Sequence, residues 1–167
     1  MATQFLFANG PMPTTAAFAP VATGATIKTL LQLKPFNTGK IIEWGLSFDG
    51  FAAAAPVKCE LLDTGTVFAT VTAAVDADVY KLSGGEDAVA SIVGLTHGTA
   101  ATGYTSTSEG TITTTRLFDV QLIAPTNQYL KQFPLGREPK LLIGNAVRIR
   151  VTAPQTVNAI AYVVVEF

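Results

Sequence analysis

Cysteine and histidine are almost absent from this sequence of 167 residues, which has one of each, Cys59 and His97. A single cysteine excludes an internal disulfide framework, so a fold of this length must be held by a hydrophobic core. The two residues also fall short of the ligand set that a zinc site needs. We therefore predict no metal and no cofactor, and a protein that is assembled in a reducing compartment inside a cell.

Charge is scarce as well. Charged residues make up 14% of the chain, against about 25% in an average protein. The net charge is −1 and no basic stripe occurs, which argues against nucleic acid as a partner. A surface of Thr, Ala, Gly and Ser is easily desolvated, because burying a charge is much more costly than burying a methyl or a bonded hydroxyl group. This favours a protein that forms large interfaces, such as a homo-oligomer; the alternative is an ordinary monomer with a neutral surface.

Long hydrophobic runs are missing, although 49% of the residues are hydrophobic. The longest apolar stretch, residues 159–165, is far shorter than the roughly 20 residues of a membrane-spanning helix. No basic cluster precedes an apolar segment near Met1, so no secretory signal is evident. We predict neither a membrane protein nor a secreted one.

Apolar and polar residues alternate with a period of two in many short segments, which is typical of half-buried strands. In residues 40–49, Ile42, Trp44, Leu46 and Phe48 form one face. We predict strands at residues 25–33, 40–49, 56–62, 67–71, 111–123, 128–133, 145–152 and 158–167. The strand at residues 128–133 is expected to end at a turn formed by Pro134, Leu135 and Gly136. The pattern predicts a hairpin of residues 56–62 with residues 67–71, and a central strand at residues 158–167, which are apolar on both faces. The fold class is an all-β, single-domain β-sandwich, jelly-roll-like, with about eight or nine strands.

The remaining segments are irregular. Residues 1–20 contain Gly10, Pro11, Pro13 and Pro20, which predicts an extended N-terminal arm ahead of a β-sandwich domain at residues 21–167, with a short strand at residues 4–8 as an option. Residues 86–95 fit a short helix or a strand. Residues 96–110, rich in Thr, Gly and Ser, predict a surface loop.

No catalytic constellation emerges from the sequence. His97 has no second ligand or nucleophile motif near it and is expected to be a solvated loop residue. Cys59 lies on an apolar strand face, where a free cysteine behaves as a small hydrophobic residue. Ser83, Gly84, Gly85 and Ser91 match neither a nucleophile elbow nor a phosphate loop. We predict that the protein is not an enzyme.

The acidic residues offer a candidate metal site and a candidate acid–base pair. Asp76, Asp78, Glu86 and Asp87 lie around a glycine pair and suggest a calcium loop, but their spacing is not that of an EF-hand, and solvated loop charges are the simpler interpretation. Glu43 and Asp49 would lie about 20 Å apart on one strand, too far for a glycosidase pair.

Several strings resemble segments of structural proteins of tailed-phage particles, in particular capsid decoration (cement) proteins. The resemblance covers residues 40–167, and its strings are Gly103-Tyr104-Thr105, Ser108-Glu109-Gly110-Thr111-Ile112, Ala124-Pro125-Thr126-Asn127-Gln128-Tyr129, Gln132-Phe133-Pro134-Leu135-Gly136-Arg137-Glu138, Val147-Arg148-Ile149-Arg150-Val151-Thr152-Ala153-Pro154 and Ala161-Tyr162-Val163-Val164-Val165-Glu166-Phe167. It implies a β-rich virion protein, commonly a homotrimer, that is assembled in the host cytoplasm, binds the major capsid protein on the outer capsid surface and stabilises the shell. It carries no catalytic residues.

Two alternatives remain open from the sequence. One is a carbohydrate-binding module in which Trp44, Tyr80 or Tyr104 stacks on a sugar ring. The other is a tail or neck structural module of the same kind of particle.

Overall fold

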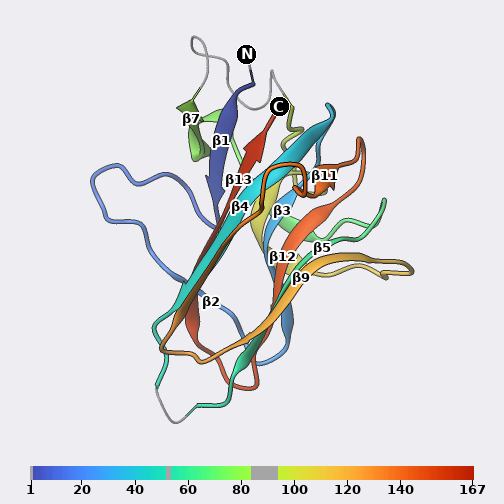
Figure 1. Ribbon diagram of the computed structural model, residues 1–167. Coiled ribbons are helices and arrows are strands. Elements are labelled where there is room, and N and C mark those ends of the chain that lie inside the picture. The colour runs from blue at the N-terminus through green and yellow to red at the C-terminus, as the bar shows by residue number, and fades with distance from the viewer. Residues whose placement is uncertain (1, 52–53, 84–93) are drawn as a thin grey trace.

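Strands form nearly all of the regular structure. The computed structural model describes residues 2–51, 54–83 and 94–167, and within them the only helical element is a 3-10 turn, η1 (Asp76–Asp78). The strands are β1 (Gln4–Ala8), β2 (Val21–Ala22), β3 (Ile27–Leu33), β4 (Gly39–Phe48), β5 (Val57–Asp63), β6 (Thr70–Ala73), β7 (Val79–Ser83), β8 (Gly103–Ser108), β9 (Arg116–Ile123), β10 (Gln128–Gln132), β11 (Lys140–Leu141), β12 (Val147–Thr152) and β13 (Asn158–Glu166). All their pairings are antiparallel, and they form two sheets (Figure 1).

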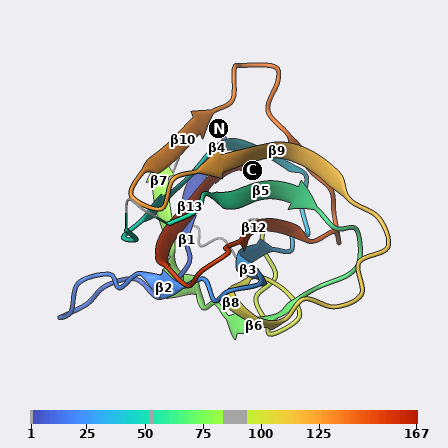
Figure 2. The same cartoon turned by 90° about the horizontal axis from the view of Figure 1, so that it is seen from below.

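Eight of these strands have the connectivity of a jelly roll. One sheet contains the order β1-β13-β4-β10, and the other contains the order β3-β12-β5-β9. Successive framework strands switch between the two facing sheets, or pair after a long return, as in two interlocked Greek keys. Figure 2 shows the two sheets facing each other, with β9 and β10 along the same side of the sandwich. The predicted β-sandwich is therefore confirmed, and the strand number is higher than expected because five further strands are added to the framework.

The chain between β5 and β9 widens both sheets at the opposite side. β7 pairs with β1, while β8 pairs with β3 and carries β6 at its outer edge. The predicted hairpin of residues 56–62 with residues 67–71 is wrong, since β5 pairs with β9 and β12 instead. The predicted surface loop at residues 96–110 is also wrong in its second half, where β8 is held by ladders on both sides.

The short strand considered at residues 4–8 is present as β1, so the predicted N-terminal arm begins with a strand of the sandwich. β1 lies between β13 and β7, and Phe5 and Phe7 have no exposed surface. The prolines begin only at Pro11, so they interrupt the ladder after β1 and not within it. The boundary expected at residue 20 is thus replaced by a loop, residues 9–20, that joins β1 to β2.

Two other expectations are corrected. The long strand expected at residues 111–123 begins only at Arg116, and the longest strand is β4. Within β4, Ile41 rather than Ile42 joins the core, because a register shift against β13 displaces the alternation there. Of residues 86–95, positions 86–93 lie outside the described residues, and Leu95 forms an isolated bridge with Pro35.

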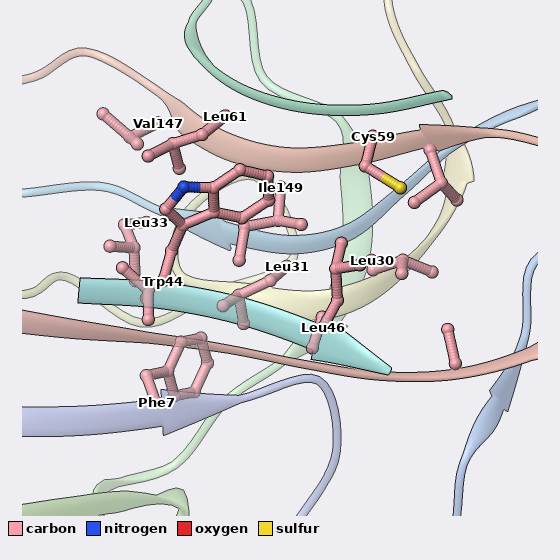
Figure 3. Packing of buried hydrophobic residues seen from close by; sticks show 14 of the residues in the cluster. Phe7, Leu30, Leu31, Leu33, Trp44, Leu46, Cys59, Leu61, Val147 and Ile149 are labelled. Carbon is pink, nitrogen blue, oxygen red and sulfur yellow. The ribbon is translucent and has the colours of Figure 1, made fainter. Parts of the chain in front are cut away.

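The core lies between the two sheets. Figure 3 shows Trp44, from β4 of the first sheet, surrounded by Leu31, Leu33, Leu61 and Ile149, which come from β3, β5 and β12 of the second sheet. Full burial of one such side chain contributes about 1.5–3 kcal/mol. β13 is central in its sheet, between β1 and β4, as its apolar faces predicted.

Candidate interaction surface

His97 is not the solvated loop residue that the sequence predicted. Its side chain is 13% exposed, and its Nδ1 lies 3.5 Å from Oδ1 of Asp76. Burial lowers the pKa of His97, and the negative charges of Asp76 and Asp78 only partly oppose this. The side chain beside His97 Nδ1 is thus a carboxylate, Asp76, and not a serine or cysteine that the imidazole could activate as a nucleophile.

The acidic loop is used for backbone contacts. Asp78 is buried and accepts hydrogen bonds from the amides of Val75 (2.9 Å) and Met12 (3.3 Å). Glu86 and Asp87 lie outside the described residues, so the structure shows only two of the four residues of the predicted calcium loop, Asp76 and Asp78. Within the described residues no three His, Cys, Asp or Glu side chains come together as a metal site would require.

Cys59 and Trp44 both belong to the core and have no exposed surface. Burial, assisted by the charge of Glu60, raises the pKa of the Cys59 thiol to about 12. The indole of Trp44 donates to Asp119 Oδ2 at 3.1 Å. Trp44 therefore cannot stack on a sugar, which removes the strongest aromatic residue of the carbohydrate-binding alternative. Tyr80 is exposed and Tyr104 is half-buried.

Glu43 on β4 and Asp49 directly after it bind different partners. Glu43 accepts a hydrogen bond of 2.6 Å from the Tyr162 hydroxyl. Asp49 accepts from the amide and the side chain of Asn158, at 3.1 and 3.0 Å. Ser83 ends β7, whereas Gly84, Gly85 and Ser91 lie outside the described residues. Among the described residues, Glu43 and Asp49 therefore bind different partners, Tyr162 and Asn158.

An ionic network that the sequence did not reveal covers the outer face of the second sheet. Arg148 on β12 has no exposed surface and pairs with Glu109 at 3.2 Å. Arg150, two residues on, pairs with Glu60 at 2.8 Å. The two arginines that share a strand are thus both neutralised by acidic partners.

A second polar cluster holds the open side of the sandwich, where β9 faces β10. Asp119 on β9 accepts hydrogen bonds from Tyr129 (2.8 Å), Gln121 (3.1 Å) and Trp44, and its carboxylate lies 3.2 Å from Lys131 on β10. Burial acts to raise the pKa of Asp119, but these donors outweigh it and hold the pKa below its ordinary value. Asp119 on β9 thus links the edge of the second sheet to Tyr129 and Lys131 on β10, at the edge of the first sheet.

The outside of the same two strands is apolar. Leu117, Val120 and Leu122 on β9 are 51%, 43% and 73% exposed, and Leu130 on β10 is 59% exposed. We call these four residues the open-edge surface. Both β9 and β10 end their sheets, so each presents backbone groups without a neighbouring strand. Natural edge strands are usually protected by lysine or proline; β9 contains neither, whereas β10 contains Lys131, which pairs with Asp119.

Comparisons with known proteins give no relative. No protein family, no curated protein and no solved structure matches this chain. Within the described residues, no helix has the length and hydrophobicity needed to cross a membrane. The surface chemistry must therefore carry the functional argument.

Proposed function

We propose that this protein is a structural component of a phage particle, a decoration protein that binds the outer capsid surface as a homo-oligomer and stabilises the shell. The observation that carries the proposal is the open-edge surface, which exposes large aliphatic side chains on two neighbouring edge strands of a chain with very few charges. The resemblance of residues 40–167 to decoration proteins gives the class of particle.

The open-edge surface supports contacts between copies of the chain. Three of its side chains lie on β9, at the edge of the second sheet, and Leu130 lies on β10, at the edge of the first. Exposed large apolar side chains grouped on an edge strand mark interaction sites, since a monomer gains nothing by leaving them in water. An unpaired edge strand adds main-chain hydrogen bonds to such a contact. The buried Asp119 cluster holds β9 and β10 in place, so the surface is ordered before a partner arrives and less entropy is lost on binding.

Assembly explains how such a module would stabilise a shell. A ligand that binds only the mature lattice stabilises that lattice by mass action. An oligomer that attaches at several points dissociates slowly even when each contact is weak. None of this requires a catalytic residue or a cofactor.

The test has two parts. Light scattering of the purified protein gives its mass in solution, and a trimer is expected. Cosedimentation with purified mature capsids of the phage that encodes it is expected to show saturable binding. A monomer at high concentration that also fails to bind capsids would refute the proposal. Binding to isolated tails or necks in place of capsids would favour the tail or neck alternative.

A further inference from the structure

The β1–β2 loop, residues 9–20, contains no charged side chain. No charged side chain occurs before Lys28. Figures 1 and 2 show this loop, in blue, projecting from one side of the molecule before it returns to β2. Most of its residues from Pro11 to Pro20 are exposed. An exposed loop of this length without any charge is unusual, because charged side chains normally keep such segments solvated.

Both ends of the loop are fixed by fully buried polar side chains. Asn9 donates from Nδ2 to the carbonyl of Ala159 (3.0 Å) and accepts from the amide of Ala161 (3.0 Å). Thr23 accepts at its hydroxyl from the amide of Val157 (3.1 Å). All three partners lie on β13 or immediately before it, so the loop is clamped to the central strand of its sheet. A third contact, from the Met12 amide to Asp78, holds the loop against η1.

A groove of about 340 Å³ lies between this loop and the body. Met12 and Phe18 line it from the loop, and Thr72 and Tyr104 line it from β6 and β8. None of the residues that line it is charged. A charged group placed in the groove would lose water without gaining a partner, so an occupant must be uncharged.

The groove wall also contains a strained residue. Thr105 on β8 has a φ of 55°, and it is the one non-glycine residue with a positive φ among the described residues. It lines the groove and lies where the pairing of β6 with β8 shifts register between Val71 and Thr72. A β-branched residue rarely adopts this conformation, and such strain is concentrated at functional sites.

We propose that the β1–β2 loop and its groove form the surface that contacts the shell, and that the occupant is an uncharged, extended segment of the shell protein with a bulky apolar side chain. This inference rests on the proposed function and assigns the shell-binding role to a different part of the molecule from the open-edge surface. The preformed loop offers the segment two walls, one of proline and alanine and one of threonine and tyrosine.

The decisive experiment places charges in the loop and in the groove wall and measures binding to purified mature capsids. Deletion of residues 2–20 is unsuitable because it removes β1. The loop variant is Thr14→Glu/Thr15→Glu, and its control is Thr113→Glu/Thr115→Glu, two exposed threonines on another segment. The groove variant is Thr72→Glu, and its control is Thr70→Glu, an exposed threonine on the same strand that does not line the groove.

We expect the loop and groove variants each to weaken capsid binding by at least about tenfold, and both controls to bind within about twofold of the wild type. Thermal unfolding of all four variants should match the wild type, since each changes an exposed side chain. Wild-type affinity in the loop and groove variants would overturn the inference while leaving the proposed function intact. A change in the oligomeric mass with unchanged capsid binding would also overturn it, because the loop would then join copies of this chain. If the wild type itself does not bind capsids, the proposed function fails, and this inference fails with it.

Discussion

Arg148 and Glu109, 39 residues apart in the chain, form an ion pair of 3.2 Å in which the arginine has no exposed surface. Glu109 also accepts hydrogen bonds from the amide and hydroxyl of Thr29 and from the hydroxyl of Ser106. Arg148 donates in addition to the carbonyls of Glu109 and Val67. The pair therefore fastens the chain between β5 and β9 onto the outer face of the second sheet.

Replacement of Glu109 by alanine should lower the free energy of unfolding by about 3–5 kcal/mol, because it leaves the buried Arg148 guanidinium with two backbone carbonyls but without its carboxylate partner. The double variant Glu109→Ala/Arg148→Met should be less destabilised than Glu109→Ala alone, since it also removes the buried positive charge of Arg148. Urea unfolding followed by circular dichroism measures both values. A single variant that loses less than about 1 kcal/mol would show that the pair is solvated.

The Asp119 cluster predicts loss of stability in acid. The pKa of Asp119 is depressed in the folded protein, so its contribution is fully present above the unfolded pKa of about 3.9. That contribution is lost as the pH falls below this value and through the folded pKa. Melting temperatures between about pH 2 and pH 6 should therefore depend less on pH in Asp119→Asn than in the wild type.

Tyr129→Phe is the companion variant, since it removes one donor to Asp119 and keeps the ring that packs edge-on against Trp44 with centroids 5.5 Å apart. Its acid dependence should be intermediate. Identical pH profiles for the wild type and Asp119→Asn would mean that other carboxylates dominate acid unfolding.

The sequence predicted the parts of this fold that depend on local alternation. β4 and β13 were identified because their apolar residues recur with the period of a strand, and the burial of Trp44, Leu46 and Cys59 follows from the same pattern. The residues of β8, Gly-Tyr-Thr-Ser-Thr-Ser, show no apolar alternation, so the sequence did not predict this strand. Its position depends on hydrogen-bonded ladders to β3 and β6, and both of these strands are far from β8 in the sequence.

The candidate surfaces depend even more on long-range pairing. β9 and β10 are the end strands of different sheets and lie on the same side of the sandwich. This arrangement follows from the strand order, which local sequence patterns do not encode. The burial of Arg148 could not be predicted without knowing that Glu109 lies opposite. In contrast, the absence of charge before Lys28, which marks the β1–β2 loop, is readable in the sequence, and the short strand considered at residues 4–8 corresponds to β1.

Cys59 should be inert in the folded protein. Its side chain has no exposed surface and its thiol has a pKa raised to about 12, so almost no thiolate is present near neutral pH. Ellman's reagent should label it only at the rate at which the protein unfolds, and completely in denaturant. Fast labelling under native conditions would contradict the burial of β5.

The clamp at the base of the β1–β2 loop predicts a stability effect at Asn9. Asn9→Ala leaves the Ala161 amide and the Ala159 carbonyl without their side-chain partner in a buried site, which should cost about 1–3 kcal/mol. Asn127→Ala is the control, because Asn127 is exposed, and it should change stability by less than about 0.5 kcal/mol. Equal stability of the two variants in urea unfolding would show that Asn9 does not hold the loop.

The open-edge surface predicts a loss of self-association without loss of folding. Leu122→Glu and Leu130→Glu each place a charge on an edge strand where the side chain is 73% and 59% exposed. A charge there remains hydrated in the monomer but must be desolvated in a contact between copies, so the concentration for half-assembly should rise at least about tenfold. Light scattering across a dilution series measures this shift.

Thr113→Glu, an exposed position outside both edge strands, is the control and should assemble as the wild type does. Melting temperatures of all three should stay close to the wild-type value, because exposed substitutions rarely change stability by more than about 0.5 kcal/mol. Wild-type assembly in both leucine variants would exclude β9 and β10 as the contact between copies.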